Sequence, residues 1–231
     1  MVAFDDIRNL PLPHLALKLL ERLGKGDVSA NSTFRNLDEA IRVNPQVDHK
    51  FLLNRLSDAW AWLESHGLIG PGTAAASKWQ RVTAPGQELA DDPNSISKVW
   101  AAERLAGPLN PLLSSAQTNF SLGDFETACF AALKTVEVEV RRAAGLPDEL
   151  VGVKLMRRAF HAADGPLTDA DAEGGEREAT ASLFAGAIGA YKNPASHRTV
   201  QFDDPVEAAE IIQLADLLLR IVHRAERRLI S

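Results

Sequence analysis

The sequence predicts a mainly α-helical protein that is built from two domains. Over most of the chain, apolar residues recur three and four positions apart, the spacing that gathers them on one face of a helix. A single stretch, within residues 68–83, has the pattern of a β-hairpin. A run of turn formers from Asp91 to Asn94 separates the N-terminal part from the rest. These observations predict helices, one hairpin and a linker between the two domains.

The first 67 residues have the pattern of three helices. Leu15, Leu19 and Leu20 lie on one face of a predicted helix over about 13–23, which ends at Gly24. A second helix is expected near 34–43 and a third over about 47–66. Two short strands, 68–69 and 78–83, then flank a Gly- and Ala-rich tip, and Pro85 with Gly86 ends the second strand.

Three helices followed by a hairpin is the order of a winged helix-turn-helix. Residues 63–69 and 81–90 also resemble the segment from recognition helix to wing in many bacterial winged-helix domains. The sequence therefore predicts such a domain over residues 1–90. Its candidate contacts to DNA are the polar residues of the third helix and of the hairpin, namely Lys50, Asn54, Arg55, Lys78 and Arg81.

The charge of this domain leaves a second interpretation open. Residues 1–94 contain 10 Lys and Arg but 12 Asp and Glu, whereas DNA-binding domains usually carry a surplus of positive charge. Trp60 and Trp62 in the third helix also indicate apolar surface. The domain is therefore predicted to contact either DNA or a protein partner.

Residues 95–231 are predicted to form a helical bundle without strands. Helices are expected over about 96–106, 109–120, 124–144, 148–162, 176–192 and 205–230. Residues 163–175 are rich in Asp and Gly and predict a loop. Ala181, Ala185 and Gly189 form a stripe of small residues on the fifth helix of this series, which favours close packing against another helix.

Ionisable side chains gather where that fifth helix ends. The segment reads Lys192-Asn193-Pro194-Ala195-Ser196-His197. Pro194 cannot continue a helix, and Asn193 precedes it at a position where helical conformation is disfavoured. The chain is therefore predicted to turn here and to bring His197 back toward Lys192. A cation, an amide and an imidazole would then lie at one helix end.

This arrangement resembles the Arg-polar-x-x-x-His motif of the HEPN superfamily, a set of helical domains of which many are metal-independent ribonucleases. Lys192 stands where that motif most often has Arg, and a lysine cannot bind phosphate through a planar fork. Over residues 95–231 the chain also resembles the uncharacterised, phage-associated bacterial family Ymh. That resemblance rests on blocks in the same order: 125–128, Glu137, 141–142, Gly152-x-x-Leu155-Met156 and 192–198.

The resemblance to HEPN domains implies a function and a set of residue roles. The protein would be an RNA endonuclease of the toxin or phage-defence kind, in which a homodimer brings two motifs together. His197 would transfer protons, Lys192 would stabilise charge, and Asn193 would hold the phosphate or the imidazole. Glu137 would orient Lys192, and Arg141 and Arg198 would line the RNA groove.

A different interpretation needs no catalysis. Asn193 and Pro194 can simply end a helix, with His197 on the surface, and Glu137 can form a solvent-exposed pair with Arg141 one helical turn away. The protein would then be a dimeric regulator that binds nucleic acid or another protein.

Composition excludes several classes of protein. The chain of 231 residues has a net charge of −6, so contacts to RNA or DNA are expected to be local. The single Cys129 cannot form a disulfide within the chain and is predicted to be a buried small side chain. No ligand spacing for a metal and no phosphate-binding loop is present, so no metal and no cofactor is predicted. With no apolar run near the length of a membrane span, a cytoplasmic location is expected.

Overall fold

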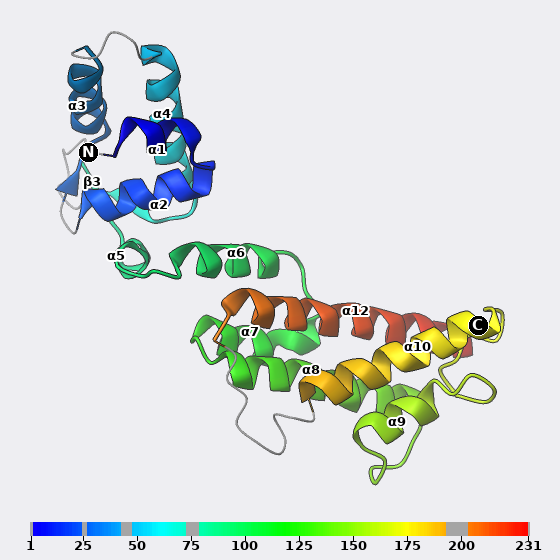
Figure 1. Ribbon diagram of the computed structural model, residues 1–231. Helices are drawn as coiled ribbons and strands as arrows, with labels where there is room; N and C mark the ends of the chain where they lie inside the picture. Colours follow the sequence, from blue (N-terminus) through cyan, green and yellow to red (C-terminus); the bar gives the residue numbers. More distant parts are fainter. Residues whose placement is uncertain (1, 25–26, 43–47, 73–78, 193–202, 231) are drawn as a thin grey trace. The chain divides into compact units, whose positions relative to one another are not determined.

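The computed structural model describes residues 2–24, 27–42, 48–72, 79–192 and 203–230 (Figure 1). The chain divides into two compact units, Met1–Ile96 and Ser97–Ser231, and each has its own apolar core. The division falls just inside α6 (Ser95–Leu105), so this helix begins in one unit and continues in the other. Each unit is therefore described by itself.

The first unit combines helices with a small antiparallel sheet. In chain order its elements are α1 (Phe4–Asn9), α2 (Leu12–Leu23), β1 (Asp27–Val28), α3 (Ala30–Arg42), α4 (His49–Ser65), β2 (Ile69–Pro71), β3 (Gln80–Val82) and α5 (Ala84–Ala90). The sheet order is β1-β3-β2, with Ile69 opposite Val82 in the hairpin. The predicted hairpin is thus present, and β1, which the sequence did not predict, joins its free edge.

The core of the first unit lies between α2 and α4 and extends to the sheet. Leu15 and Leu20 of α2 and Leu52 and Leu63 of α4 are fully buried, in keeping with the leucine spacing of both helices. Pro85 does more than end a strand, because it lies in the first turn of α5. The side chain of Thr83 caps this helix by accepting a hydrogen bond from the Gly86 amide at 3.2 Å.

The second unit is a helical bundle. After α6 come the 3₁₀ turn η1 (Pro111–Leu113), α7 (Ser114–Ser121), α8 (Phe125–Ala144), α9 (Gly152–Ala159), α10 (Gly174–Ala187), the π-helical turn η2 (Ile188–Lys192) and α12 (Pro205–Ile230). The long helices α8 and α12 pack against each other, α7 packs against α8, and α10 packs against α9 (Figure 1). The mainly helical architecture is therefore confirmed, and the described part of this unit contains no strand.

Local geometry shortens one predicted helix and changes the end of another. The helix predicted over 148–162 begins only at Gly152, whose φ of 60° is left-handed and marks a sharp turn into α9. The helix predicted over 176–192 is α-helical only to Ala187, after which the chain continues as the π turn η2. Such π turns widen a helix locally and are frequent at functional sites.

The core of the second unit contains the cysteine as expected. Cys129 is fully buried on α8, and burial, followed by the nearby charge of Glu207, raises the pKa of its thiol to about 12. The prediction of a buried small side chain is confirmed, and this thiol is inert as a nucleophile. Within the described ranges, no helix combines the length and the apolar character needed to cross a membrane.

Candidate functional site

Helix α8 carries a carboxylate into the interior of the second unit. Val136 and Val140 of α8 are fully buried, and Glu137, next to Val136, is only 6% exposed. A buried carboxylate is costly unless it is paired and hydrogen-bonded. The alternative in which Glu137 forms a solvent-exposed pair with Arg141 is therefore wrong, because the Glu137 carboxylate is buried. Its oxygens need hydrogen-bond donors from neighbouring residues.

Three donors surround the carboxylate of Glu137. The Nζ atom of Lys192 lies 3.1 Å from Oε2, and the backbone amide of Gly152 donates to the same oxygen at 3.0 Å. The Nη2 atom of Arg141 donates to Oε1 at 3.3 Å. The contact between Glu137 and Lys192 that the family resemblance implied is therefore present, and so is the contact to Arg141.

Lys192 reaches this carboxylate from the last position of the π turn η2. Its side chain is 15% exposed, and its Nζ atom lies 5.9 Å from the centre of the Phe130 ring on α8. The ammonium group is thus held between a buried carboxylate and an aromatic ring. This contact holds the π turn η2 against α8.

Arg141 fastens the segment before α9 to α8. Its Nε and Nη2 atoms donate to the carbonyl oxygen of Leu150, at 3.2 and 3.0 Å, and Nε lies 3.9 Å from the exposed carboxylate of Asp148. These bonds place Gly152 so that its amide points at Glu137. The resemblance to HEPN domains implied that Arg141 lines an RNA groove, but its guanidinium is largely buried and makes this internal contact.

Gly152 is the member of this cluster to which sequence reasoning gave no role. Its left-handed φ turns its amide toward the carboxylate, a conformation that favours glycine. In the sequence, Gly152 stood out only as part of the block Gly152-x-x-Leu155-Met156, which carries the resemblance to the Ymh family. The hydrogen bond itself is visible only once α8 and α9 are packed together.

The other half of the motif lies outside the described residues. This holds for Asn193, His197 and Arg198, and also for Lys78 in the first unit. Their predicted roles therefore remain predictions. In the described residues, no group of three or more His, Cys, Asp or Glu side chains lies close enough together to hold a metal ion.

The small-residue stripe packs inside the chain. Ala185 is buried in the core of the second unit, and the Cβ that Gly189 lacks would lie 3.3 Å from Val153 of α9. The close packing against another helix that this stripe favoured is present, and the other helix is α9 of the same chain. The homodimer remains a prediction. A different face of the helix is exposed, and it carries Ser182, Leu183, Gly186 and Ala190.

In the first unit the candidate residues separate into two groups. Lys50 and Asn54 are exposed on α4, and Arg81 is exposed on β3. Arg55 points elsewhere: its Nε atom donates to the carbonyl oxygen of Ile7 at 3.0 Å, and Nη2 donates to that of Leu10. Both carbonyls lie at the end of α1, so Arg55 caps this helix from α4.

Comparison with known proteins concerns the part of the chain that holds this cluster. Residues 110–222 match the model of a family described as "Protein of unknown function (Hypoth_ymh)". The Ymh match contains Glu137, Arg141, Gly152 and Lys192, and it is narrower than the expected 95–231. The first unit lies outside the Ymh match. No curated protein and no solved structure matches the chain.

Proposed function

We propose that the second unit is an RNA endonuclease of the HEPN type, with a toxin or phage-defence role, that cleaves without a metal ion. The observation that carries the proposal is the ion pair between Lys192 and the buried Glu137, 3.1 Å long, at the first position of the motif. The pair holds a cation at the point where the helix ends and the motif continues. The fixed positive charge of Lys192 would stabilise the negative charge that develops on the phosphate in the transition state.

In the proposed reaction the ribose 2′-hydroxyl attacks the adjacent phosphorus. One His197 accepts the proton of this hydroxyl as the oxygen bonds to phosphorus. A second imidazole donates a proton to the 5′-oxygen as its bond to phosphorus breaks, which leaves a 2′,3′-cyclic phosphate. Lys192 stabilises the charge on the phosphorane, and Asn193 holds the phosphate or the imidazole.

The two imidazoles come from two copies of the chain, so the proposal includes a homodimer. The exposed face of α10 and η2, with Ser182, Leu183, Gly186 and Ala190, ends next to Lys192. Small side chains there permit close approach of two helices, and Leu183, 42% exposed, gains from burial. A two-fold axis near this face would bring two motifs together.

The first unit is proposed to be a winged helix that selects the target or the partner. The hairpin β2-β3 follows α4, as this architecture requires, and the exposed Lys50, Asn54 and Arg81 are suited to contact phosphates or base edges. With Arg55 used to cap α1, fewer cations are available for DNA than the sequence indicated. This difference favours a protein partner over DNA.

Cleavage of RNA by the purified full-length protein tests the proposal. Activity is expected to persist in EDTA, to leave 2′,3′-cyclic phosphate ends, and to spare a substrate with 2′-deoxyribose at the cut. His197→Ala should lose on the order of 10²- to 10⁴-fold in rate, the usual contribution of proton transfer. Lys192→Arg should keep activity and Lys192→Ala should fall well below it. Equal cleavage by wild type and His197→Ala would reject the proposal.

The alternative is a dimeric binding protein without catalysis, in which the bundle only dimerises. The same ion pair supports it in a different way, because a lysine 15% exposed and paired with a buried carboxylate also stabilises a helix end. The two functions differ in one readout. A regulator would bind its partner equally well with His197→Ala, and no preparation would cleave RNA.

A further inference from the structure

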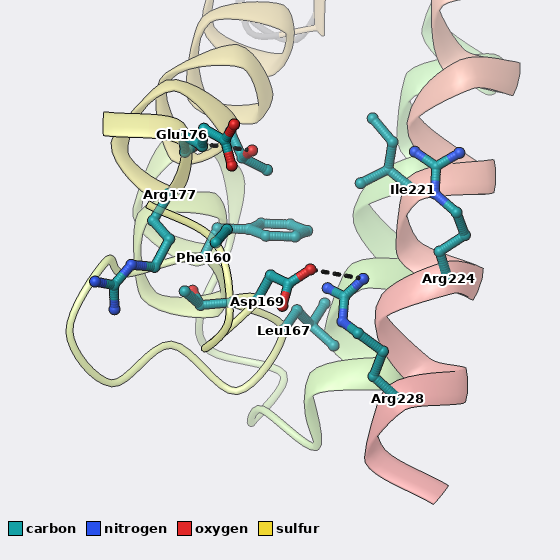
Figure 2. A pocket seen from close by; sticks show the side chains of 11 residues that line it. Phe160, Leu167, Asp169, Glu176, Arg177, Ile221, Arg224 and Arg228 are labelled. Atoms are coloured by element: carbon teal, nitrogen blue, oxygen red, sulfur yellow. Dashed lines mark hydrogen bonds and ion pairs between the residues drawn. The ribbon is translucent and has the colours of Figure 1, made fainter. Parts of the chain in front are cut away.

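A pocket of about 340 Å³ lies at the opposite end of α10 from Lys192, between the segment that follows α9, the first turns of α10, and α12 (Figure 2). It is lined by apolar side chains at its base and by charged side chains and hydroxyls around them: Phe160, Leu167, Ile221, Thr168, Thr180, Asp169, Glu176, Arg177, Arg224 and Arg228. None of these residues belongs to the motif. The pocket has the size of a small-molecule site.

The base of the pocket is rigid. Phe160 is 1% exposed and stacks on Phe184 of α10, with ring centres 4.0 Å apart. The loop that carries Leu167 is fastened by its own hydrogen bonds, from the Leu167 amide to the Ala159 carbonyl at 2.9 Å and from the Thr168 hydroxyl to the His161 carbonyl at 2.9 Å. A preformed cavity reduces the conformational entropy that the protein must lose when a ligand binds.

Two arginines of α12 supply hydrogen-bond donors at the pocket. Arg224 lines it and, among the described residues, forms no hydrogen bond or ion pair. Arg228, one turn further along, lies 3.4 Å from the carboxylate of Asp169, and both of these side chains are well exposed. Figure 2 shows both arginines on α12: Arg228 points across the pocket to Asp169, and the side chain of Arg224 extends along α12 toward Ile221.

Arg177 holds the loop before α10 in place and is not directed at α12 (Figure 2). Its guanidinium extends away from α12 in Figure 2, and its Nη1 atom donates to the carbonyl oxygen of Ala162 at 3.0 Å. It fastens the loop to α10, so the contacts to an anion fall to Arg224 and Arg228. Asp169 and Glu176 supply acceptors beside them.

We infer that this pocket binds a nucleoside monophosphate. The planar guanidinium of arginine binds a phosphate through paired, charge-assisted hydrogen bonds, and the guanidinium of Arg224 has N–H donors available for them. The carboxylates of Asp169 and Glu176 would accept hydrogen bonds from the ribose hydroxyls or the base amino group, and the apolar base would contact the ring. A fatty acid would make no hydrogen bond to either carboxylate, and a bare phosphate would make no contact with the apolar base.

Titration calorimetry on the full-length protein tests this inference, with the four nucleoside monophosphates, the matching nucleosides and inorganic phosphate as probes. At least one monophosphate is expected to bind once per chain, about tenfold or more tightly than its nucleoside and than inorganic phosphate. The nucleoside lacks the charged hydrogen bonds to the arginines, and inorganic phosphate lacks the contact with the apolar base. No monophosphate binding below millimolar concentration would overturn the inference. Equal binding of inorganic phosphate would also overturn it, since the apolar base would then contribute nothing.

Matched variants locate the ligand. Arg224→Ala is expected to weaken binding about tenfold or more. Arg227→Ala removes one exposed charge from the same helix outside the pocket, and it should leave affinity within about twofold. Circular dichroism confirms that both variants fold. Equal effects of the two substitutions would mean unspecific attraction to a basic helix end and would reject the site.

Discussion

At the scale of single residues, Glu137 connects three parts of the second unit. Its carboxylate accepts from Lys192 at the helix end, from Arg141 on its own helix and from the amide of Gly152 at the start of α9. Removing one member of a buried charge pair costs more than the pair itself contributes, because the partner remains buried without its counter-charge.

Glu137→Gln is therefore expected to lower the free energy of unfolding by about 3 kcal/mol. Urea unfolding of the full chain measures this. Glu178→Gln, an exposed carboxylate on α10, is the control and should change stability by under about 0.5 kcal/mol. A double-mutant cycle with Lys192→Met should show a coupling of about 1 kcal/mol or more. Additive effects would mean that the ion pair contributes nothing.

A second charged cluster makes stability depend on pH. Glu139 accepts from Arg142 at 2.6 and 3.0 Å and contacts His223 at 3.1 Å, while Arg142 also binds Glu226 at 2.8 Å. The hydrogen bonds from Arg142, followed by that from His223, lower the pKa of Glu139 below its ordinary value of 4.5. The cluster therefore stabilises the fold above that pH, and this contribution is lost as the pH falls through the lowered pKa.

Glu139→Gln is expected to be less stable than wild type at pH 7, and this difference is expected to be smaller at pH 3. Urea unfolding at both pH values gives the two differences. The physical reason is that acid protonates Glu139 in the wild type and so removes the same negative charge that the substitution to Gln removes. The same difference at both pH values would show that the charge of Glu139 is not involved.

At the scale of elements, the start of α9 depends on the backbone of Gly152. The helix begins at a left-handed residue whose amide bonds Glu137, while the bonds from Arg141 to Leu150 hold the preceding segment. Sequence periodicity over 148–162 predicted a longer helix. It could not show that residues 148–151 would lie outside the helix, where Leu150 is bonded by Arg141 of α8.

Gly152→Ala is expected to lower the free energy of unfolding by about 1–2 kcal/mol, because a side chain makes left-handed backbone unfavourable. The matched control is Gly175→Ala in the first turn of α10, where an added Cβ meets open space. That change should be neutral or stabilising by up to about 1 kcal/mol. Thermal and urea unfolding compare the two. Similar losses from both would contradict the role assigned to Gly152.

At the scale of the whole molecule, two separate cores predict two folding units. One core is formed by α2, α4 and the sheet, and the other by α7 to α12, and no buried residue belongs to both. Fragments 1–96 and 97–231 are therefore each expected to show a cooperative thermal transition by circular dichroism. A fragment that melts gradually would show that its unit depends on the other, and the shared helix α6 would be the reason.

Periodicity and turn chemistry determined most of the elements. The leucine pattern of α2 and α4 fixes their buried faces, the hairpin follows from its apolar ends and Gly-rich tip, and the long helices α8 and α12 follow from apolar spacing. The two-residue strand β1 and the short helices α1 and α5 were not predicted, because such short elements have too few residues to display a period.

Residue patterns in the sequence were enough to predict that the chain is mainly helical, that Cys129 is buried and that Lys192 lies near the end of a helix. The sequence also indicated Glu137 as a partner for Lys192, through a family pattern. The packing of the helices was needed to show that Glu137 is buried and that Arg141 and Gly152 bind its carboxylate. It also showed that Arg55 caps α1, whereas Lys50 is exposed. The reason is physical: periodicity reports which face of an element is apolar, whereas the partner of a buried charge is set by which elements pack together.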